Sequence, residues 1–185
     1  EGFFLASSLL SSLNFPANRV VRASVLYNKI LREVGLGQAL DISYVKQKKM
    51  GEEWVFRIHH YKTAGYTIFG PLAVGAILAG ANNEQISLLE EFGTPVGVAF
   101  QIHDDELGMF STEEQLGKPA DSDLREGKLT LLIVKALEKA KGEDLKTLKR
   151  VYGNKNLTAE DVERVREIIK KTGALDYSQK KCQEL

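Results

Sequence analysis

The chain has 185 residues, of which 43% are hydrophobic, 27% charged and 8% aromatic. This balance is typical of a globular protein with a core of its own, and it excludes disordered, collagen-like and supercharged chains. The 25 basic and 25 acidic side chains cancel, which argues against a nucleic-acid-binding protein, because such proteins are usually basic. The single cysteine, Cys182, excludes an internal disulfide, and we predict a reducing, cytoplasmic location.

The balanced total conceals three blocks of charge. Residues 1–81 carry nine basic and five acidic side chains, net +4, and residues 82–127 carry two and eleven, net −9. Residues 128–185 carry fourteen and nine, net +5. An acidic block is by itself usually a solvated helix face, so a function for it needs a motif.

Apolar residues recur at helical spacing along the first half of the chain. We predict a long helix over residues 18–45 and another over residues 52–63 that continues or kinks into an apolar, glycine-rich segment. A short helix over residues 83–92 is expected to end at Gly93, and Thr94-Pro95 predicts the start of the next, which runs to about residue 110. The alternative is one longer helix with a kink at the proline.

The second half of the chain begins with a polar stretch, residues 111–128, that predicts a loop because it contains glycine and proline. Amphipathic helices follow over residues 129–140, 143–152 and 158–171, and a last short helix starts at Ala174. No stretch alternates as a strand does. The sequence therefore predicts an all-α fold, with residues 1–185 as a single domain.

One segment, residues 64–81, is an uncharged run at the lower limit of membrane-spanning length. The rest of the chain has the character of a soluble protein, and a single marginal segment is more often a buried core helix. We therefore predict no membrane span.

Residues 101–108, Gln-Ile-His-Asp-Asp-Glu-Leu-Gly, lie on an otherwise apolar helix. Adjacent carboxylates repel unless a cation or solvent neutralises them, and Asp104 and Asp105 are directed about 100° apart on a helix. Gln101 is one helical turn before them. Hard oxygen ligands of this kind suit Mg²⁺, which is usually shared with the phosphates of a substrate.

Three further segments carry polar groups that suit a phosphate-containing ligand. The sequence GKPADSDLREGKLT brings Lys118 and Lys128 soon after the acidic pair, and lysine binds phosphate as a compact charge. In YKTAGY, a helix would place Lys62 and Tyr66 one turn apart with Thr63 adjacent. The fourth segment is GQALD, at residues 37–41.

In this order, the segments GQALD, YKTAGY, FQIHDDELG and GKPADSDLREGKLTLL resemble the C-terminal signatures of the trans-isoprenyl diphosphate synthases, also called polyprenyl synthetases. The resemblance covers residues 37–132, and DDELG resembles the second aspartate-rich motif of that family. It implies helices around a deep central cavity. It also implies a prenyltransferase that condenses isopentenyl diphosphate head-to-tail with an allylic diphosphate, using Mg²⁺ between two aspartate-rich motifs.

The resemblance assigns roles by motif position. Two carboxylates are assigned to Mg²⁺: Asp104 and Asp105. Three cations are assigned to the leaving diphosphate: Lys62, Lys118 and Lys128. Three polar side chains are assigned to the surroundings of the allylic carbon: Thr63, Tyr66 and Gln101. Together with Lys62 they are the predicted catalytic residues. Metal ions and lysines stabilise a departing anion, and an apolar wall keeps the carbocation from water, so the chemistry agrees with these roles.

The sequence departs from the family pattern in two places. Gly108 stands where the second motif usually has its last acid, and the first aspartate-rich motif is absent, since Asp41 is the first aspartate. We therefore expect a C-terminal portion of a synthase that does not catalyse condensation alone. The alternative is a non-catalytic helical subunit or interaction module that retains the fold, and a weaker one is a terpene cyclase.

The products and partners of the parent enzyme follow from the resemblance alone. It implies farnesyl or geranylgeranyl diphosphate as product, with a lean toward an archaeal-type geranylgeranyl diphosphate synthase. It implies an allylic diphosphate and isopentenyl diphosphate as substrates, no nucleic-acid partner, and a homodimer in the full-length form.

Overall fold

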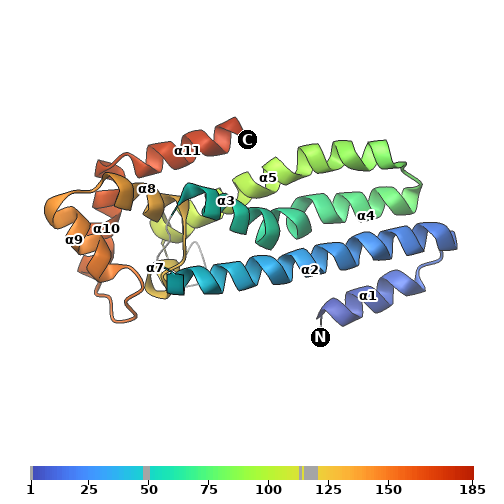
Figure 1. Ribbon diagram of the computed structural model, residues 1–185, viewed down its shortest axis with the longest axis horizontal. Helices are drawn as coiled ribbons and strands as arrows, with labels where there is room; N and C mark the ends of the chain where they lie inside the picture. The colour runs from blue at the N-terminus through green and yellow to red at the C-terminus, as the bar shows by residue number, and fades with distance from the viewer. Residues whose placement is uncertain (1, 48–50, 113, 115–120) are drawn as a thin grey trace. The chain divides into compact units, whose positions relative to one another are not determined.

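A computed structural model describes residues 2–47, 51–112, 114 and 121–185, with the backbone alone for residues 44–47. All regular elements of this described part are helices (Figure 1), which confirms the predicted all-α fold. They are, in chain order, α1 (Gly2–Ser12), α2 (Ala17–Gln47), α3 (Glu52–His59), the π-helix η1 (His60–Phe69), α4 (Gly70–Ala79), α5 (Asn83–Phe110), α7 (Ser122–Glu126), α8 (Leu131–Lys139), α9 (Gly142–Val151), α10 (Ala159–Lys171) and α11 (Ala174–Glu184).

The contacts divide the chain into two compact units. The first comprises Glu1–Ala39 and Ile58–Val98, and the second comprises Leu40–Arg57 and Ala99–Leu185. The long helices α2 and α5 each contribute residues to both units. The expectation of a single domain stays a prediction.

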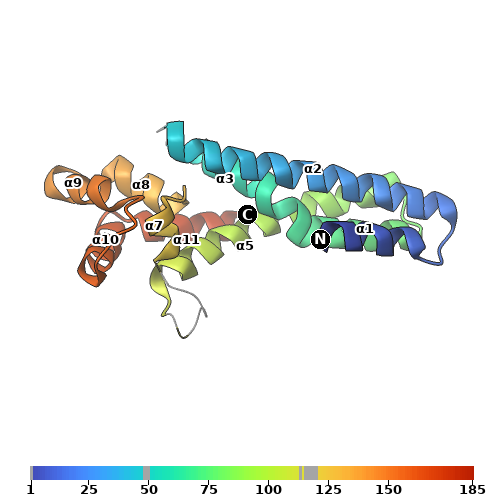
Figure 2. The same cartoon turned by 90° about the horizontal axis from the view of Figure 1, so that it is seen from below.

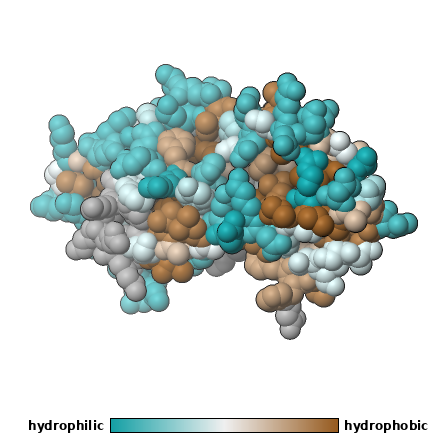
Figure 3. Space-filling view, turned by 45° about the vertical axis from the view of Figure 1, so that its right-hand side comes forward, coloured by the Kyte–Doolittle hydropathy of each residue, from teal (hydrophilic) through white to brown (hydrophobic). Residues whose placement is uncertain are grey.

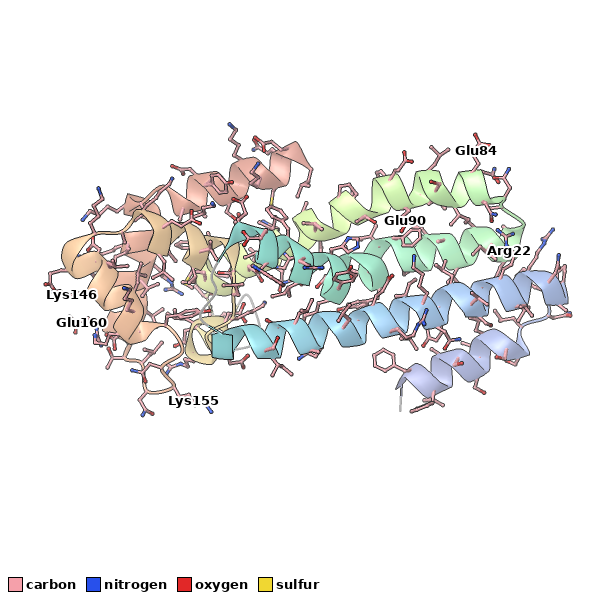
Figure 4. All side chains as sticks on the ribbon, viewed as in Figure 1. Arg22, Glu84, Glu90, Lys146, Lys155 and Glu160 are labelled. Atoms are coloured by element: carbon pink, nitrogen blue, oxygen red, sulfur yellow. The ribbon has the colours of Figure 1, made fainter. Side chains whose placement is uncertain are left out.

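The helices of the first unit run roughly along one direction in Figure 1, and α1 lies beside α2 in both views (Figures 1 and 2). The core of this unit joins Leu10 of α1, Ala23 of α2 and Ile77 of α4, with Ile86 of α5 packed against them. The turn between α4 and α5 is fixed from α2, because the guanidinium of Arg22 donates to the Ala81 carbonyl and the Asn83 side chain (Figure 4). Apolar spacing on each helix therefore builds one shared core.

The second unit is built around α8, α9, α10 and α11. A cluster of buried side chains comes from all of these helices, and its fully buried members include Leu132, Leu148, Val165 and Ile168. Charged side chains such as Lys146, Lys155 and Glu160 are exposed and point away from it (Figure 4). The amphipathic pattern of residues 129–171 is thus confirmed.

The predicted break near Gly93 is wrong. Helix α5 runs without interruption from Asn83 to Phe110 with Pro95 inside it, which is the longer helix that was the alternative. Gly93 has a packing role, since a Cβ there would lie 3.0 Å from the Cα of Phe69 in the neighbouring helix. A glycine that permits close helix packing was therefore mistaken for a helix end.

Three elements were not predicted: helix α1, the π-helix η1, and the short helix α7 within the stretch expected to be a loop. The apolar segment over residues 64–81 is divided between η1 and α4, and Ala64, Phe69, Ala73 and Ile77 in it are buried. Across the described residues, no helix combines the length and apolar character needed to cross a membrane.

Candidate functional site

The acidic pair predicted from DDELG lies near the C-terminal end of α5, in the second unit. Asp105 is buried, with 3% of its surface exposed, and Asp104 is partly exposed. Gln101 joins the two, because its Nε2 lies 2.9 Å from Asp105 Oδ1 and 3.4 Å from Asp104 Oδ2. The helical spacing of three and four residues therefore gathers the three side chains as expected.

Lys128 joins this group from a distant part of the sequence. Its Nζ lies 2.8 Å from Asp105 Oδ1 and 3.1 Å from Asp123 Oδ2. Burial by itself would lower the pKa of Lys128, but the charges of the two carboxylates and their hydrogen bonds outweigh it, so its pKa is raised above the ordinary value. Lys128 is therefore held as a cation against the buried carboxylate.

Asp123 also belongs to this group, although no motif predicted it. It lies in the first turn of α7, five residues before Lys128. A Cβ at Gly108 would lie 3.3 Å from Asp123 Oδ2, so the position of the usual last acid of the motif faces this carboxylate. The presence of glycine at 108 spares Asp123 a neighbouring negative charge.

The group Lys62, Thr63 and Tyr66 lies on η1, in the first unit. Thr63 is buried, Lys62 is partly buried, and Tyr66 is half exposed at the wall of an apolar pocket of about 550 Å³. The other walls of that pocket come from α1, α2 and α4. The π-helical winding differs from the α-helix assumed from the sequence, and π-helical turns are frequent at functional sites.

The segment GQALD contributes to the seating of η1. A Cβ at Gly37 would lie 2.5 Å from the backbone N of Lys62 and 2.7 Å from its Cα. Only a residue without a side chain allows α2 to approach the backbone of Lys62 so closely. The glycine of GQALD therefore has a packing role: it lets α2 lie directly against the backbone that carries Lys62.

The structure thus assembles the predicted residues in two groups, one in each unit. The first unit holds Lys62, Thr63 and Tyr66, and the second holds Gln101, Asp104, Asp105 and Lys128. Lys118 lies outside the described residues. These assignments of function stay predictions.

The donor set around Asp105 fits a divalent cation that is only partly held by protein. Within the described ranges, no cluster of three or more His, Cys, Asp or Glu side chains forms a metal-binding group. Two carboxylates suit Mg²⁺, which usually binds one or two of them and completes its shell with water and phosphate oxygens. The ammonium of Lys128 lies 2.8 Å from Asp105 Oδ1, so this carboxylate already has a positive charge beside it.

Comparison with known proteins gives a consistent result. The polyprenyl synthetase family profile matches residues 2–170. The chain is 35% identical over 178 residues to the geranylgeranyl diphosphate synthase of Sulfolobus acidocaldarius, covering 96% of this chain and 53% of that one. It is 41% identical over 144 residues to the short chain isoprenyl diphosphate synthase of Methanothermobacter thermautotrophicus, covering 77% and 43%.

A solved structure agrees with these relatives. The geranylgeranyl pyrophosphate synthase of Corynebacterium glutamicum, complexed with isoprenyl diphosphate and magnesium, superposes with a TM-score of 0.87 at 33% identity. The match covers 92% of this chain and 48% of that chain. The chain spans about half the length of the curated relatives it matches.

Proposed function

Because the chain belongs to the polyprenyl synthetase family, we propose that it supplies the diphosphate- and metal-binding part of a prenyltransferase. The proposed reaction joins isopentenyl diphosphate head-to-tail to an allylic diphosphate and releases diphosphate. The observation that carries the proposal is the group of Asp104, Asp105, Gln101 and Lys128, in which a buried carboxylate and a lysine meet. The names of the relatives support geranylgeranyl diphosphate as product, with farnesyl diphosphate as the alternative.

Asp104 and Asp105 would hold Mg²⁺, and the metal would supply charge that stabilises the departing diphosphate. Magnesium in the corynebacterial relative supports this assignment. The amide of Gln101 would orient both carboxylates. Three lysines would bind the diphosphate oxygens in this proposal: Lys62, Lys118 and Lys128. Thr63 and Tyr66 would lie near the allylic carbon, where oriented oxygens and an aromatic ring stabilise positive charge.

Binding of inorganic diphosphate to the purified chain tests the proposal by titration calorimetry. We expect binding that requires Mg²⁺ and is lost in Asp104→Ala, which removes one proposed metal ligand. Glu84→Gln removes an exposed carboxylate from the start of α5 and serves as the matched control. Absence of Mg²⁺-dependent binding would favour the non-catalytic module instead.

The catalytic ability of the 185-residue chain is a separate question. We propose that it does not condense the two substrates alone, since its sequence lacks the first aspartate-rich motif. The test compares product formed from labelled isopentenyl diphosphate by the chain and by Asp104→Ala. Product above the level of that variant would contradict the proposal.

We further propose that the full-length protein is a homodimer. Large apolar side chains are exposed on α1 and α2 of the first unit, among them Phe4, Leu9, Val21 and Val25. One face of the molecule shows hydrophobic surface between hydrophilic patches (Figure 3). Apolar surface of this kind is typical of contacts between subunits. Light scattering after size-exclusion chromatography of the full-length protein would reveal the dimer, and a monomer would contradict it.

A further inference from the structure

The turn that follows α9 packs against the end of α7, within the second unit. The Tyr152 hydroxyl donates to the carbonyl oxygen of Gly127 at 2.6 Å, and the Gly153 N–H donates to the carbonyl of Leu124 at 3.0 Å. A Cβ at Gly127 would lie 3.1 Å from the Cα of Gly153, so the two backbones are in close contact. The residue that follows Gly127 is Lys128.

The peptide unit between Gly127 and Lys128 is consequently held at both of its polar ends. Its carbonyl accepts from Tyr152, and its N–H, that of Lys128, donates to the carbonyl of Asp123 at 2.9 Å. Gly127 has a φ of 69°, a left-handed conformation that favours glycine. The peptide that precedes the Lys128 side chain is therefore oriented by contacts that do not involve its ammonium.

The same turn region is attached to α7 at a second place. The guanidinium of Arg125 donates to the carbonyl of Lys155 at 2.8 Å and to that of Leu157 at 3.1 Å, and it pairs with Asp121. The segment after α9 thus binds α7 at Tyr152 and Gly153 and again farther along, at residues 155 and 157. Tyr152 itself packs against the hydrophobic core of this unit, and this packing holds the ring that carries the hydroxyl.

The phenol of Tyr152 is suited to this donor role. Burial raises the pKa of Tyr152 to about 12, and the negative charge of Asp41 adds to the rise. The hydroxyl therefore keeps its proton throughout the physiological range and can donate a hydrogen bond to the Gly127 carbonyl.

We propose that Tyr152 is a positioning residue for Lys128: through the Gly127 carbonyl it holds the Lys128 ammonium at Asp105 and Asp123, where it would meet a diphosphate. The ligand part of this inference rests on the proposed function, whereas the geometric part does not. Without the hydroxyl, this peptide keeps the bond from its N–H to the Asp123 carbonyl but loses the bond to its own carbonyl, so the ammonium is held less firmly between the two carboxylates.

The test uses Tyr152→Phe, which removes the hydroxyl and retains the packed ring. The matched control is Tyr27→Phe, because the Tyr27 hydroxyl also donates to a backbone carbonyl, that of Phe3, at 3.0 Å in the first unit. Two quantities are measured on each purified variant. One is the acetylation rate of Lys128 by acetic anhydride, followed by mass spectrometry with Lys135 as internal reference. The other is the Kd of inorganic diphosphate with Mg²⁺.

In Tyr152→Phe we expect faster acetylation of Lys128 but not of Lys135, and a Kd for diphosphate about fivefold higher, the equivalent of one ordinary hydrogen bond. In Tyr27→Phe both quantities should equal those of the parent. The melting temperature is recorded for both variants, since a purely structural role would lower it and leave the contrast between the two lysines unchanged.

The outcomes separate the inference from the proposed function. Unchanged acetylation of Lys128 would overturn the positioning role whatever happens to diphosphate. Faster acetylation with an unchanged Kd would overturn its relevance to the ligand. Faster acetylation in a chain whose parent binds no diphosphate would support the positioning role and overturn the proposed function.

Discussion

Lys128 has two roles that compete for one ammonium group. In the structure it neutralises Asp105, whose side chain is almost fully buried, and under the proposed function it would also contact a diphosphate. A metal ion on Asp104 and Asp105 would take over the first role and leave the ammonium available for the anion. The site is therefore built so that its positive charge is already present before a ligand arrives.

Replacing Lys128 by methionine tests whether its ammonium neutralises Asp105. The variant removes an ammonium group that lies 2.8 Å from a buried carboxylate, and loss of one partner of a buried ion pair typically costs about 3 kcal/mol of unfolding free energy. Because Mg²⁺ can replace the lost charge, we expect added Mg²⁺ to raise the melting temperature of Lys128→Met more than that of the parent. Urea denaturation and thermal melting with and without Mg²⁺ measure both effects.

The control for that prediction is Lys135→Met. Lys135 also pairs with a carboxylate at close range, Glu52, whose side chain is 24% exposed and therefore partly solvated. Its removal should cost less and give no response to Mg²⁺. Equal stability of Lys128→Met and the parent would contradict the assigned role of Lys128.

At the level of elements, glycine 37 sets how closely α2 approaches the backbone of η1. Gly37→Ala introduces a methyl group that would lie 2.5 Å from the Lys62 backbone N, so the helices must separate. Overpacking of this kind costs about 1–3 kcal/mol. Gly35→Ala on the same helix meets nothing within 4 Å and should stabilise by up to about 1 kcal/mol through helix propensity. Urea denaturation of the two variants should therefore move in opposite directions, and equal shifts would contradict the close approach.

Elements with local signals were predictable from the sequence, and those with distant partners were not. Helix α10 begins with a capping box in which Thr158 and Asp161 bond each other's backbone, and both residues stand in the sequence at the required spacing. Gly93 and Pro95 carried an equally strong local signal for a break, yet the packing of α5 against Phe69 overrides it. The π-helix has no sequence signature of comparable strength.

The same distinction applies to the site. The contact of Gln101 with Asp104 and Asp105 follows from helical spacing, so the sequence predicts it. The pairing of Lys128 with Asp105 spans 23 residues and depends on how α7 is held, so motif order suggested only that both belong to one site. The place of Asp123 beside Lys128 became known from the tertiary structure alone. The role of the Tyr152 hydroxyl likewise had no motif that would predict it.

For the molecule as a whole, ion pairs between helices link stability to pH in the second unit. Asp144 of α9 pairs with Lys171 and Arg164 of α10, so these contacts join the two helices. The hydrogen bond from Lys171 and the charge of Arg164 also hold the pKa of Asp144 below its ordinary value of 3.8. A hydrogen bond from Arg150 does the same for Asp161. Burial alone would raise the pKa of Glu52, but Lys135 and Tyr177 outweigh it, so this pKa is also lowered.

A carboxyl group whose pKa is lower in the folded than in the unfolded chain binds fewer protons when folded, so it stabilises the fold above its unfolded pKa. This contribution is fully present at pH 7 and is lost as the pH falls through about 4 toward the folded pKa values. Urea denaturation between pH 7 and pH 3 should therefore show a falling unfolding free energy, and the fall should be shallower in Asp144→Asn, which cannot titrate. A slope unchanged by that substitution would mean that the pairs with Lys171 and Arg164 hold α9 and α10 together through geometry and not through charge.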